Sequence, residues 1–259
     1  MYPTVSIANQ SIIVKGCSDT NEFNQVMEFQ PFKDWLQAFG EQQSQRKNEF
    51  VINSIDIQNI DYFKSEKIGF VKFKADVSFK ETGKSAPGIV FMRGGAVSML
   101  IVLKAPGERD RILLTLQPRI PIPHLSFPEL PAGMLDGSGN FAGTAAKEIE
   151  EETGLKIKQD ELVDMTDWAY GNRYRGVYPS AGGSDEFLRL FVCIKHMEKS
   201  QINELEGKLA GLRDQGESIT LKLVSMEDAW KSSPDAKLLS SLALYEALKT
   251  KILLKFGST

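Results

Sequence analysis

The chain has 259 residues, 42% hydrophobic and 25% charged, so it can form one large domain or two modest ones with a sizeable core. Its net charge of −3 argues against non-specific binding to phosphate backbones, and no nucleic-acid partner is expected. Two cysteines and two histidines are too few for a disulfide framework or a structural zinc site. No apolar run is long enough to span a bilayer, so no membrane partner is expected.

The N-terminal residues, MYPTVSIANQSIIVKGCSDTNEF, carry no recognisable targeting pattern. They lack a basic segment followed by an apolar one, and they lack the Arg-rich composition of a transit peptide. The low cysteine content favours a reducing compartment. A cytoplasmic location is therefore expected, with a nuclear or organellar one left open.

The N-terminal part is expected to contain one amphipathic helix followed by strands. In PFKDWLQAF the apolar residues recur at helical spacing after Pro31, which predicts a helix that ends near Gly40. The polar stretch EQQSQRKN predicts a loop, and FVINSIDI predicts a strand. In GFVKFKADVSFK apolar and polar residues alternate, which predicts a strand with one buried face.

Further strands are expected from GIVFMRGGAVSMLIVLKA, broken near Gly94 and Gly95, and from RILLTLQ, FLRLFVCIK and SITLKLVS. The proline-rich segment PRIPIPHLSFPELP can form neither a regular helix nor a central strand, so a long functional loop is expected there. The C-terminal PDAKLLSSLALYEALKTKILLKF predicts a helix with an apolar side. These elements predict an α/β (α+β) fold with a mixed β-sheet between helices, preceded by a β-rich subdomain over residues 1–85.

Glu148, Glu150, Glu151 and Glu152 crowd the end of one predicted helix. Three of them, at i, i+3 and i+4, project from one side, where like charges repel. The helix dipole also disfavours negative charge late in a helix. A solvated acidic face is the simpler interpretation. A bound Mg²⁺ would offset both unfavourable terms, because hard divalent cations take carboxylate oxygens.

The stretch from Gly133 to Leu155 resembles the Nudix box, which combines a Gly, an isolated Glu and a terminal Arg-Glu-hydrophobic-any-Glu-Glu-any-Gly-hydrophobic run at fixed spacing. After the opening Gly133, the residues in register are Glu148, Ile149, Glu151, Glu152, Gly154 and Leu155. The resemblance implies a Nudix α/β/α sandwich over residues 86–259.

Two positions depart from this pattern. Gly139 replaces the isolated Glu, and Lys147 replaces the Arg. Lys147 keeps the positive charge but not the bidentate fork of an Arg, and Asp136 is close enough in sequence to compensate for the lost Glu. These departures bear on the catalytic rate more than on the fold.

The segments RGGAV, ELPAGML, YPSAGGSDE and GLRDQGESITLKLV resemble the ADP-ribose/ADP-sugar pyrophosphatase branch of this family, plant-type ADP-sugar diphosphatases in particular. The resemblance implies Mg²⁺-dependent hydrolysis of the pyrophosphate bond of nucleoside diphosphate sugars, with Mn²⁺ as the alternative metal. ADP-ribose would give AMP and ribose 5-phosphate, and ADP-glucose would give AMP and glucose 1-phosphate. A homodimer is also implied, with substrate and dimer contacts in the N-terminal subdomain.

By this resemblance Glu148 and Glu152 would ligate the metal together with the backbone carbonyl of Ala132. Glu151 would join them or act on the attacking water. Glu217, in DQGES, would hold a metal or orient that water as a second catalytic residue. Without the resemblance, Glu217 would be interpreted as an exposed loop carboxylate.

The expected substrate-binding residues also come from the resemblance. Arg119 matches a family Arg that contacts phosphates, and Arg93 is a similarly placed candidate; each is otherwise an ordinary exposed Arg. Glu129 would position a metal water or cap a turn. Asp185 and Glu186 would line the substrate pocket or only blunt the end of a strand.

Two function classes stay open at this point, a pyrophosphatase and a catalytically weak Nudix module that binds a nucleotide or a protein partner. Gly139 and Lys147 favour the module, whereas the retained carboxylates favour the enzyme. Trp168 and Tyr170 are candidates for stacking on a base or sugar, although core packing is the simpler interpretation of Trp168. The sequence determines neither the preferred sugar, nor the metal and its stoichiometry, nor the oligomeric state.

Overall fold

The computed structural model describes residues 2–46, 49–63, 67–135, 139–211 and 218–257. Its contacts divide the chain into two compact units. Unit 1 comprises Met1–Gly95 and Ser180–Glu186, and unit 2 comprises Ala96–Pro179 and Phe187–Thr259. The chain therefore leaves unit 2 between that unit's two segments to contribute a short loop to unit 1.

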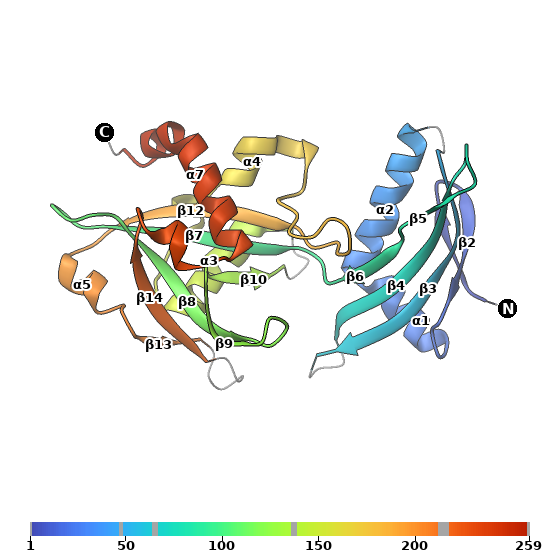
Figure 1. Cartoon of the computed structure of the whole chain (residues 1–259), viewed down its shortest axis with the longest axis horizontal. Helices are drawn as coiled ribbons and strands as arrows, with labels where there is room; N and C mark the ends of the chain where they lie inside the picture. Colours follow the sequence, from blue (N-terminus) through green and yellow to red (C-terminus); the bar gives the residue numbers. More distant parts are fainter. Residues whose placement is uncertain (1, 47–48, 64–66, 136–138, 212–217, 258–259) are drawn as a thin grey trace. The chain divides into compact units, whose positions relative to one another are not determined.

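The described part of unit 1 is a β-sheet with helices on one face (Figure 1). Its strands are β1 (Thr4–Ile7), β2 (Gln10–Lys15), β3 (Phe50–Tyr62), β4 (Ile68–Phe79), β5 (Ser85–Ala86) and β6 (Ile89–Met92). Its helices are α1 (Thr20–Glu28) and α2 (Gln30–Gln45). The strands run in the order β1-β2-β3-β4-β5 with β6 also beside β4, and only the β2–β3 pair is parallel.

The alternation predicted for β4 determines the core of unit 1. Val71, Phe73 and Ala75 are buried in the cluster that the helices cover. Phe32 and Trp35 of α2 pack against Phe73 at ring-centroid distances of 5.7 and 5.0 Å. The apolar stripe of α2 thus lies where the helical spacing placed it.

Helix α2 extends beyond the predicted end, and residues 41–45 of the segment expected as a loop belong to it. Gly40 lies inside the helix. Gln and Glu are good helix formers, which outweighs the weak stop signal of one glycine. Gln43 is also only 2% exposed, and its Nε2 donates to the carbonyl oxygen of Phe50 at 2.9 Å. Burial of this polar residue explains why the stretch is ordered.

The described part of unit 2 is a mixed sheet with helices on both faces (Figure 1). Its strands are β7 (Ala96–Lys104), β8 (Arg111–Arg119), β9 (His124–Glu129), β10 (Ala132–Met134), β11 (Val163–Asp164), β12 (Leu188–His196), β13 (Leu209–Ala210) and β14 (Ile219–Ser225). Its α-helices are α3 (Phe141–Thr153), α4 (Met165–Tyr170), α5 (Lys199–Asn203), α6 (Ala229–Ser232) and α7 (Ala236–Lys255), with short 3₁₀ turns at Gln159–Glu161 and Gly171–Arg173.

The order of this sheet is β11-β12-β7-β8-β14-β13, with β10 also beside β7 and β9 also beside β8. Strands β7 and β12 are parallel, and the other pairs are antiparallel. Along β7 the odd-numbered residues share a core cluster with Ala145 and Ile149 of α3. The even-numbered apolar residues share another with Leu238 and Tyr245 of α7. Because β7 is covered on both faces, its sequence is a nearly continuous apolar run. The mixed sheet with helices on both faces confirms the predicted α/β fold.

The proline-rich segment is a hairpin rather than the long loop expected. Strand β8 continues to Arg119, a turn follows, and β9 returns antiparallel to it. The rule that excludes proline from central strands still holds, because β8 is the one neighbour of β9 among the described strands. The register shifts between Gln117 and Arg119, which accommodates Pro118.

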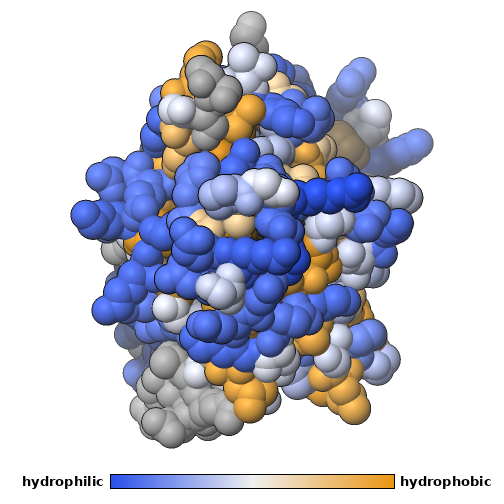
Figure 2. Space-filling view, turned by 90° about the vertical axis from the view of Figure 1, so that its left-hand side faces the viewer, coloured by the Kyte–Doolittle hydropathy of each residue, from blue (hydrophilic) through white to orange (hydrophobic). Residues whose placement is uncertain are grey.

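Seen from the side that carries α5 and the end of α7, the surface is predominantly hydrophilic, with apolar residues in separate groups (Figure 2). Large apolar side chains exposed in unit 2 include Leu209, Trp230 and Leu254. Scattered apolar residues of this kind are normal at a protein surface. No helix in the described ranges is long and apolar enough to cross a membrane.

Candidate functional site

Helix α3 carries the carboxylate cluster and has well-formed ends. The side chain of Asn140 accepts a hydrogen bond from the N–H of Gly143 and so caps the N-terminus. Gly154 ends the helix with φ of 74°, a left-handed conformation that glycine adopts without strain. Ala145 and Ile149 anchor one side of the helix in the core, which turns part of the Glu cluster toward β10.

Glu152 is only 6% exposed. One of its carboxylate oxygens accepts the N–H of Ala132 at 3.0 Å, and the other accepts Nε2 of Gln117 at 3.0 Å. Burial raises the pKa of Glu152 to about 8; the two hydrogen bonds lower it, and the nearby carboxylates of Glu148 and Glu129 raise it. The protein thus holds an acid in a place where its ionised form is disfavoured.

Glu148 lies against Gly133 of β10. A Cβ atom added to Gly133 would lie 1.9 Å from Cδ and 2.1 Å from Oε1 of Glu148. The glycine that opens the Nudix-like pattern is therefore required by space, because any side chain at that position would displace the carboxylate. Glycine here permits close approach of a backbone to a functional group.

Glu151 is more exposed than Glu152, with 27% of its side chain accessible. It pairs with Lys147, one turn earlier in the helix, at 3.5 Å. Lys147 is 72% exposed. Glu150 points away from this group and pairs with Lys156 at 3.8 Å, both in solvent. Gly139 precedes the helix with φ of 74°, and a Cβ atom added there would meet no described atom within 4 Å, so space does not require glycine at that position.

Glu129, at the end of β9, is also buried, at 1% exposed. It accepts hydrogen bonds from Nε of Arg119 at 2.6 Å and from Nζ of Lys237 at 2.7 Å. Lys237 also contacts Asp235 at 3.1 Å, and Asp235 accepts the N–H of Leu130 at 3.3 Å. Although burial lowers the pKa of Lys237, the Asp235 and Glu129 carboxylates raise it above its ordinary value.

The other expected substrate-binding residues lie in unit 1. Asp185 accepts the backbone N–H groups of Arg93 and Gly94 at 2.8 and 3.1 Å, and burial raises the pKa of Asp185 despite these bonds. Glu186 pairs with the guanidinium of Arg93 at 3.4 Å. Nε of Arg93 is buried without a hydrogen-bond partner among the described residues. Asp185 thus holds the backbone of Arg93 and Gly94 in place.

The remaining expectations divide between the core, the surface and the undescribed ranges. Trp168 packs against the core cluster on the α7 face, with Nζ of Lys251 4.1 Å from its ring centroid. Tyr170 is 39% exposed and contacts the ring of Tyr174. Glu217 and Asp136 lie outside the described residues.

Sequence reasoning missed three residues of this site, Gln117, Asp235 and Lys237. Gln117 and Arg119 are two apart on β8, a spacing that places both on one face of a strand, but the neighbouring prolines favour a loop. Asp235 precedes a predicted helix, which is an N-cap signal. No local pattern marks Lys237, because its partner Glu129 is more than a hundred residues away in sequence.

The donor chemistry around Glu152 fits a hard divalent cation. Carboxylate oxygens and a backbone carbonyl are the ligands that Mg²⁺ takes, and the glycine at 133 leaves room for the Glu148 carboxylate beside β10. No described cation offsets the charge of Glu152. Among the residues that the structure describes, no three His, Cys, Asp or Glu side chains are close enough to form a metal site by themselves.

A protein-family model described as NUDIX domain matches residues 92–242, more than half of the chain. The chain belongs to the NUDIX domain family. It is a Nudix hydrolase, a class of enzyme that acts on pyrophosphate bonds.

This Nudix hydrolase is similar to several named proteins. It is 39% identical over 242 residues to Nudix hydrolase 14, chloroplastic, of Arabidopsis thaliana, covering 92% of this chain and 77% of that protein. It is 28% identical to the ADP-ribose pyrophosphatase of Bacillus subtilis (strain 168), covering 64% and 73% of the two chains. A crystal structure of an ADP compounds hydrolase aligns with a TM-score of 0.49 at 15% identity, over 78% of this chain and 97% of that one.

The comparisons leave the location of this Nudix hydrolase as a prediction. The Arabidopsis relative carries the word chloroplastic in its name. That description applies to the relative. The expected cytoplasmic location is not confirmed by it.

Proposed function

We propose that this Nudix hydrolase cleaves the pyrophosphate bond of nucleoside diphosphate sugars such as ADP-ribose and ADP-glucose, with Mg²⁺ as its cofactor. The observation that carries the proposal is the buried carboxylate of Glu152, held beside Ala132 with no described cation to offset it. The similarity to a bacterial ADP-ribose pyrophosphatase supports this substrate class.

Glu148, Glu152 and the carbonyl oxygen of Ala132 would hold the cation, with Glu151 close by. Glu217, outside the described residues, is proposed as a further ligand or as the residue that orients water. When bound, a divalent cation neutralises the diphosphate and polarises the phosphorus. Mn²⁺ offers the same chemistry and is the alternative metal.

Arg119 would bind the substrate's phosphates. Its guanidinium is fixed by Glu129 but remains 40% exposed, so donors are left for an incoming anion. A planar guanidinium recognises phosphate oxygens with two parallel hydrogen bonds. Glu151, which is more exposed than Glu152, would accept a proton from the attacking water. The products are AMP and a sugar phosphate.

Unit 1 is proposed to supply further substrate contacts and the contacts of a homodimer. Arg93 has unused donor capacity at Nε. Asp185 and Glu186 hold the backbone and the guanidinium of this residue. Their proposed role in substrate binding is therefore to fix Arg93.

The test is hydrolysis of ADP-ribose and ADP-glucose in parallel, with Mg²⁺, by the wild type, Glu152→Gln and Glu150→Gln. We expect Glu152→Gln to lower kcat/KM by at least about a hundredfold, or ~3 kcal/mol of barrier. Glu150 lies on the same helix but points into solvent, so Glu150→Gln should stay within about twofold of the wild type. The ratio of the two substrates identifies the preferred sugar.

The second candidate function is a catalytically weak module that binds a nucleotide or a protein partner. Gly139 and Lys147 favour it, because they replace the acid and the Arg of the family pattern. Absence of turnover above background with both substrates, despite metal binding, would make this the leading function.

A further inference from the structure

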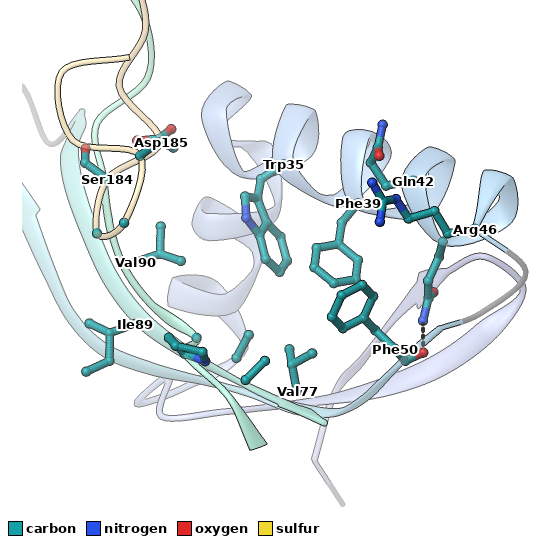
Figure 3. A pocket seen from close by; sticks show the side chains of 18 residues that line it. Trp35, Phe39, Gln42, Arg46, Phe50, Val77, Ile89, Val90, Ser184 and Asp185 are labelled. Carbon is teal, nitrogen blue, oxygen red and sulfur yellow. Dashed lines mark hydrogen bonds between the residues drawn. The ribbon is translucent and has the colours of Figure 1, made fainter. Parts of the chain in front are cut away.

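A pocket of about 470 Å³ lies within unit 1, between the C-terminal half of α2 and the sheet (Figure 3). Trp35 and Phe39 of α2 and Phe50 of β3 point into it. The sheet side carries Val77 and Val90, and the Ser180–Glu186 loop closes the far end. This size and this mixture of aromatic and sparse polar groups are typical of small-molecule sites.

Small residues leave space on the sheet side of the pocket. Ala75 of β4 and Ala86 of β5 line it, together with Gly88 between β5 and β6. A side chain cannot replace Gly88, because its Cβ would lie 2.0 Å from the carbonyl oxygen of Ala75. The aromatic side chains of α2 therefore face a space that the sheet does not fill. A flat apolar ligand would bury apolar area against them.

One polar group in this lining lacks a partner. Gln43 is 2% exposed, and its Nε2 donates to the carbonyl oxygen of Phe50 at 2.9 Å. That bond fixes the orientation of the amide and leaves Oε1 as a buried acceptor without a hydrogen bond among the described residues. This oxygen is too buried to be reached from the pocket, so Gln43 supports the wall beside Phe50 and does not contact a ligand.

The mouth of the pocket carries a cation. Arg46 lines it next to Gln42, at the end of α2. Its guanidinium pairs with Glu49 at 3.5 Å, with both side chains more than half exposed. Exposed ion pairs of this kind contribute little to stability. An anionic ligand can therefore replace Glu49 as the partner of Arg46 at a small cost in free energy.

We propose that this pocket binds a small planar aromatic anion. The ring lies against Trp35 and Phe39, and its anionic group meets Arg46. The pocket contains none of the α3 carboxylates, so the proposal is independent of the hydrolysis proposed above.

Three probes test this proposal on the unaltered chain, by calorimetric titration. Benzimidazole-5-carboxylate and naphthalene-2-carboxylate both have the ring and the anion, whereas benzimidazole lacks the anion. We expect each carboxylate to bind at least about tenfold more tightly than benzimidazole. Equal affinities of all three probes, or no binding of either carboxylate at about 10 mM, would overturn the proposal.

Variants locate the binding. Ala86→Leu narrows the pocket and should abolish binding of benzimidazole-5-carboxylate, and Arg46→Met should weaken it about tenfold. The matched control is Arg109→Met, another exposed Arg paired with a Glu, at 2.8 Å in unit 2, which should change nothing. Glu152→Gln should bind the probe like the wild type. Binding that survives Ala86→Leu, or that Glu152→Gln removes, would place the probe elsewhere and contradict the proposal.

Discussion

Glu129 and Glu152 are both buried in unit 2, and their surroundings differ. Glu129 lies between Arg119 and Lys237, so the protein itself supplies the opposite charge. Among the described residues, Glu152 accepts hydrogen bonds from neutral donors, the N–H of Ala132 and the amide of Gln117. Burial raises the pKa of Glu152 to about 8, whereas Glu129 has its own ion pairs.

This difference separates a structural acid from one that awaits a ligand. A buried charge is tolerated when it is paired, and Glu129 meets that condition within the folded chain. Glu152 does not meet it in the described residues, so an added cation would contribute more there than anywhere near Glu129. The comparison makes opposite predictions for the same chemical change at the two positions.

Glu129→Gln should have the largest effect on stability. It leaves Arg119 and the buried Lys237 without their shared counter-charge, and loss of one partner from a buried ion pair costs about 3 kcal/mol. Urea titration at pH 7 measures the free energy of unfolding. Glu227→Gln is the control, because Glu227 pairs with Arg109 at the surface and its loss should matter little. Equal losses in the two variants would contradict a structural role for Glu129.

Glu152→Gln should change stability in the opposite direction, raising the free energy of unfolding by roughly 2 kcal/mol at pH 8 in the presence of a chelator. Folding raises the pKa of Glu152 from 4.5 to about 8. The protonated side chain therefore contributes its full stability to the folded wild type below pH 4.5, and this contribution is lost as the pH rises through 8. The gain in the variant should therefore vanish near pH 4. Thermal unfolding across this range tests it, and a pH-independent difference would refute it.

Added Mg²⁺ should reverse that ranking. A ligand that binds only the folded state stabilises by about 2.7 kcal/mol at a hundred times its Kd. The wild type should gain this at pH 8, and Glu152→Gln should gain little. The same thermal unfolding experiment with a magnesium series measures it. Equal gains in both proteins would mean that Glu152 does not hold the cation.

Lys237→Met should act on substrate binding through Glu129 and Arg119. We expect KM for ADP-ribose to rise about tenfold with kcat nearly unchanged, since a phosphate contact loses its fixed geometry. Lys237→Arg keeps the charge and should recover most of the loss. Lys249→Met is the control on the same helix, because Lys249 pairs with Glu246 in solvent. A fall in kcat alone would contradict this role.

Lys147→Arg should have the smallest effect, a change in kcat/KM of less than about threefold. Lys147 is mostly exposed and already pairs with Glu151. An Arg adds a fork but little new charge. Steady-state kinetics with ADP-ribose provide the measurement. A rise of tenfold or more would show that the departure from the family pattern limits catalysis.

The fold was largely predictable where one periodicity dominated. The alternation in β4 identified a strand with one buried face, and the apolar run of β7 identified a further strand. The proline-rich hairpin was missed because proline excludes a central strand but not an edge strand. The end of α2 was misplaced because burial of Gln43 depends on Phe50, beyond the range of any local pattern.

For the candidate site, spacing alone placed Glu148, Glu151 and Glu152 on α3, because helix geometry is local. The network of Glu129, Asp235 and Lys237 joins residues distant in sequence, so no window of sequence contains its signal. The roles assigned to all of the expected site residues remain predictions. One of these residues, Glu217, lies outside the described residues.

The loop Ser180–Glu186 has a practical consequence for anyone who exchanges parts between related proteins. It belongs to unit 1 but lies between two segments of unit 2. Removing residues 1–95 would strip Asp185 of the backbone donors at Arg93 and Gly94 and leave its carboxylate unsatisfied. A chimaera that replaces unit 1 must therefore transplant both segments together, because a single splice junction cannot separate the two units.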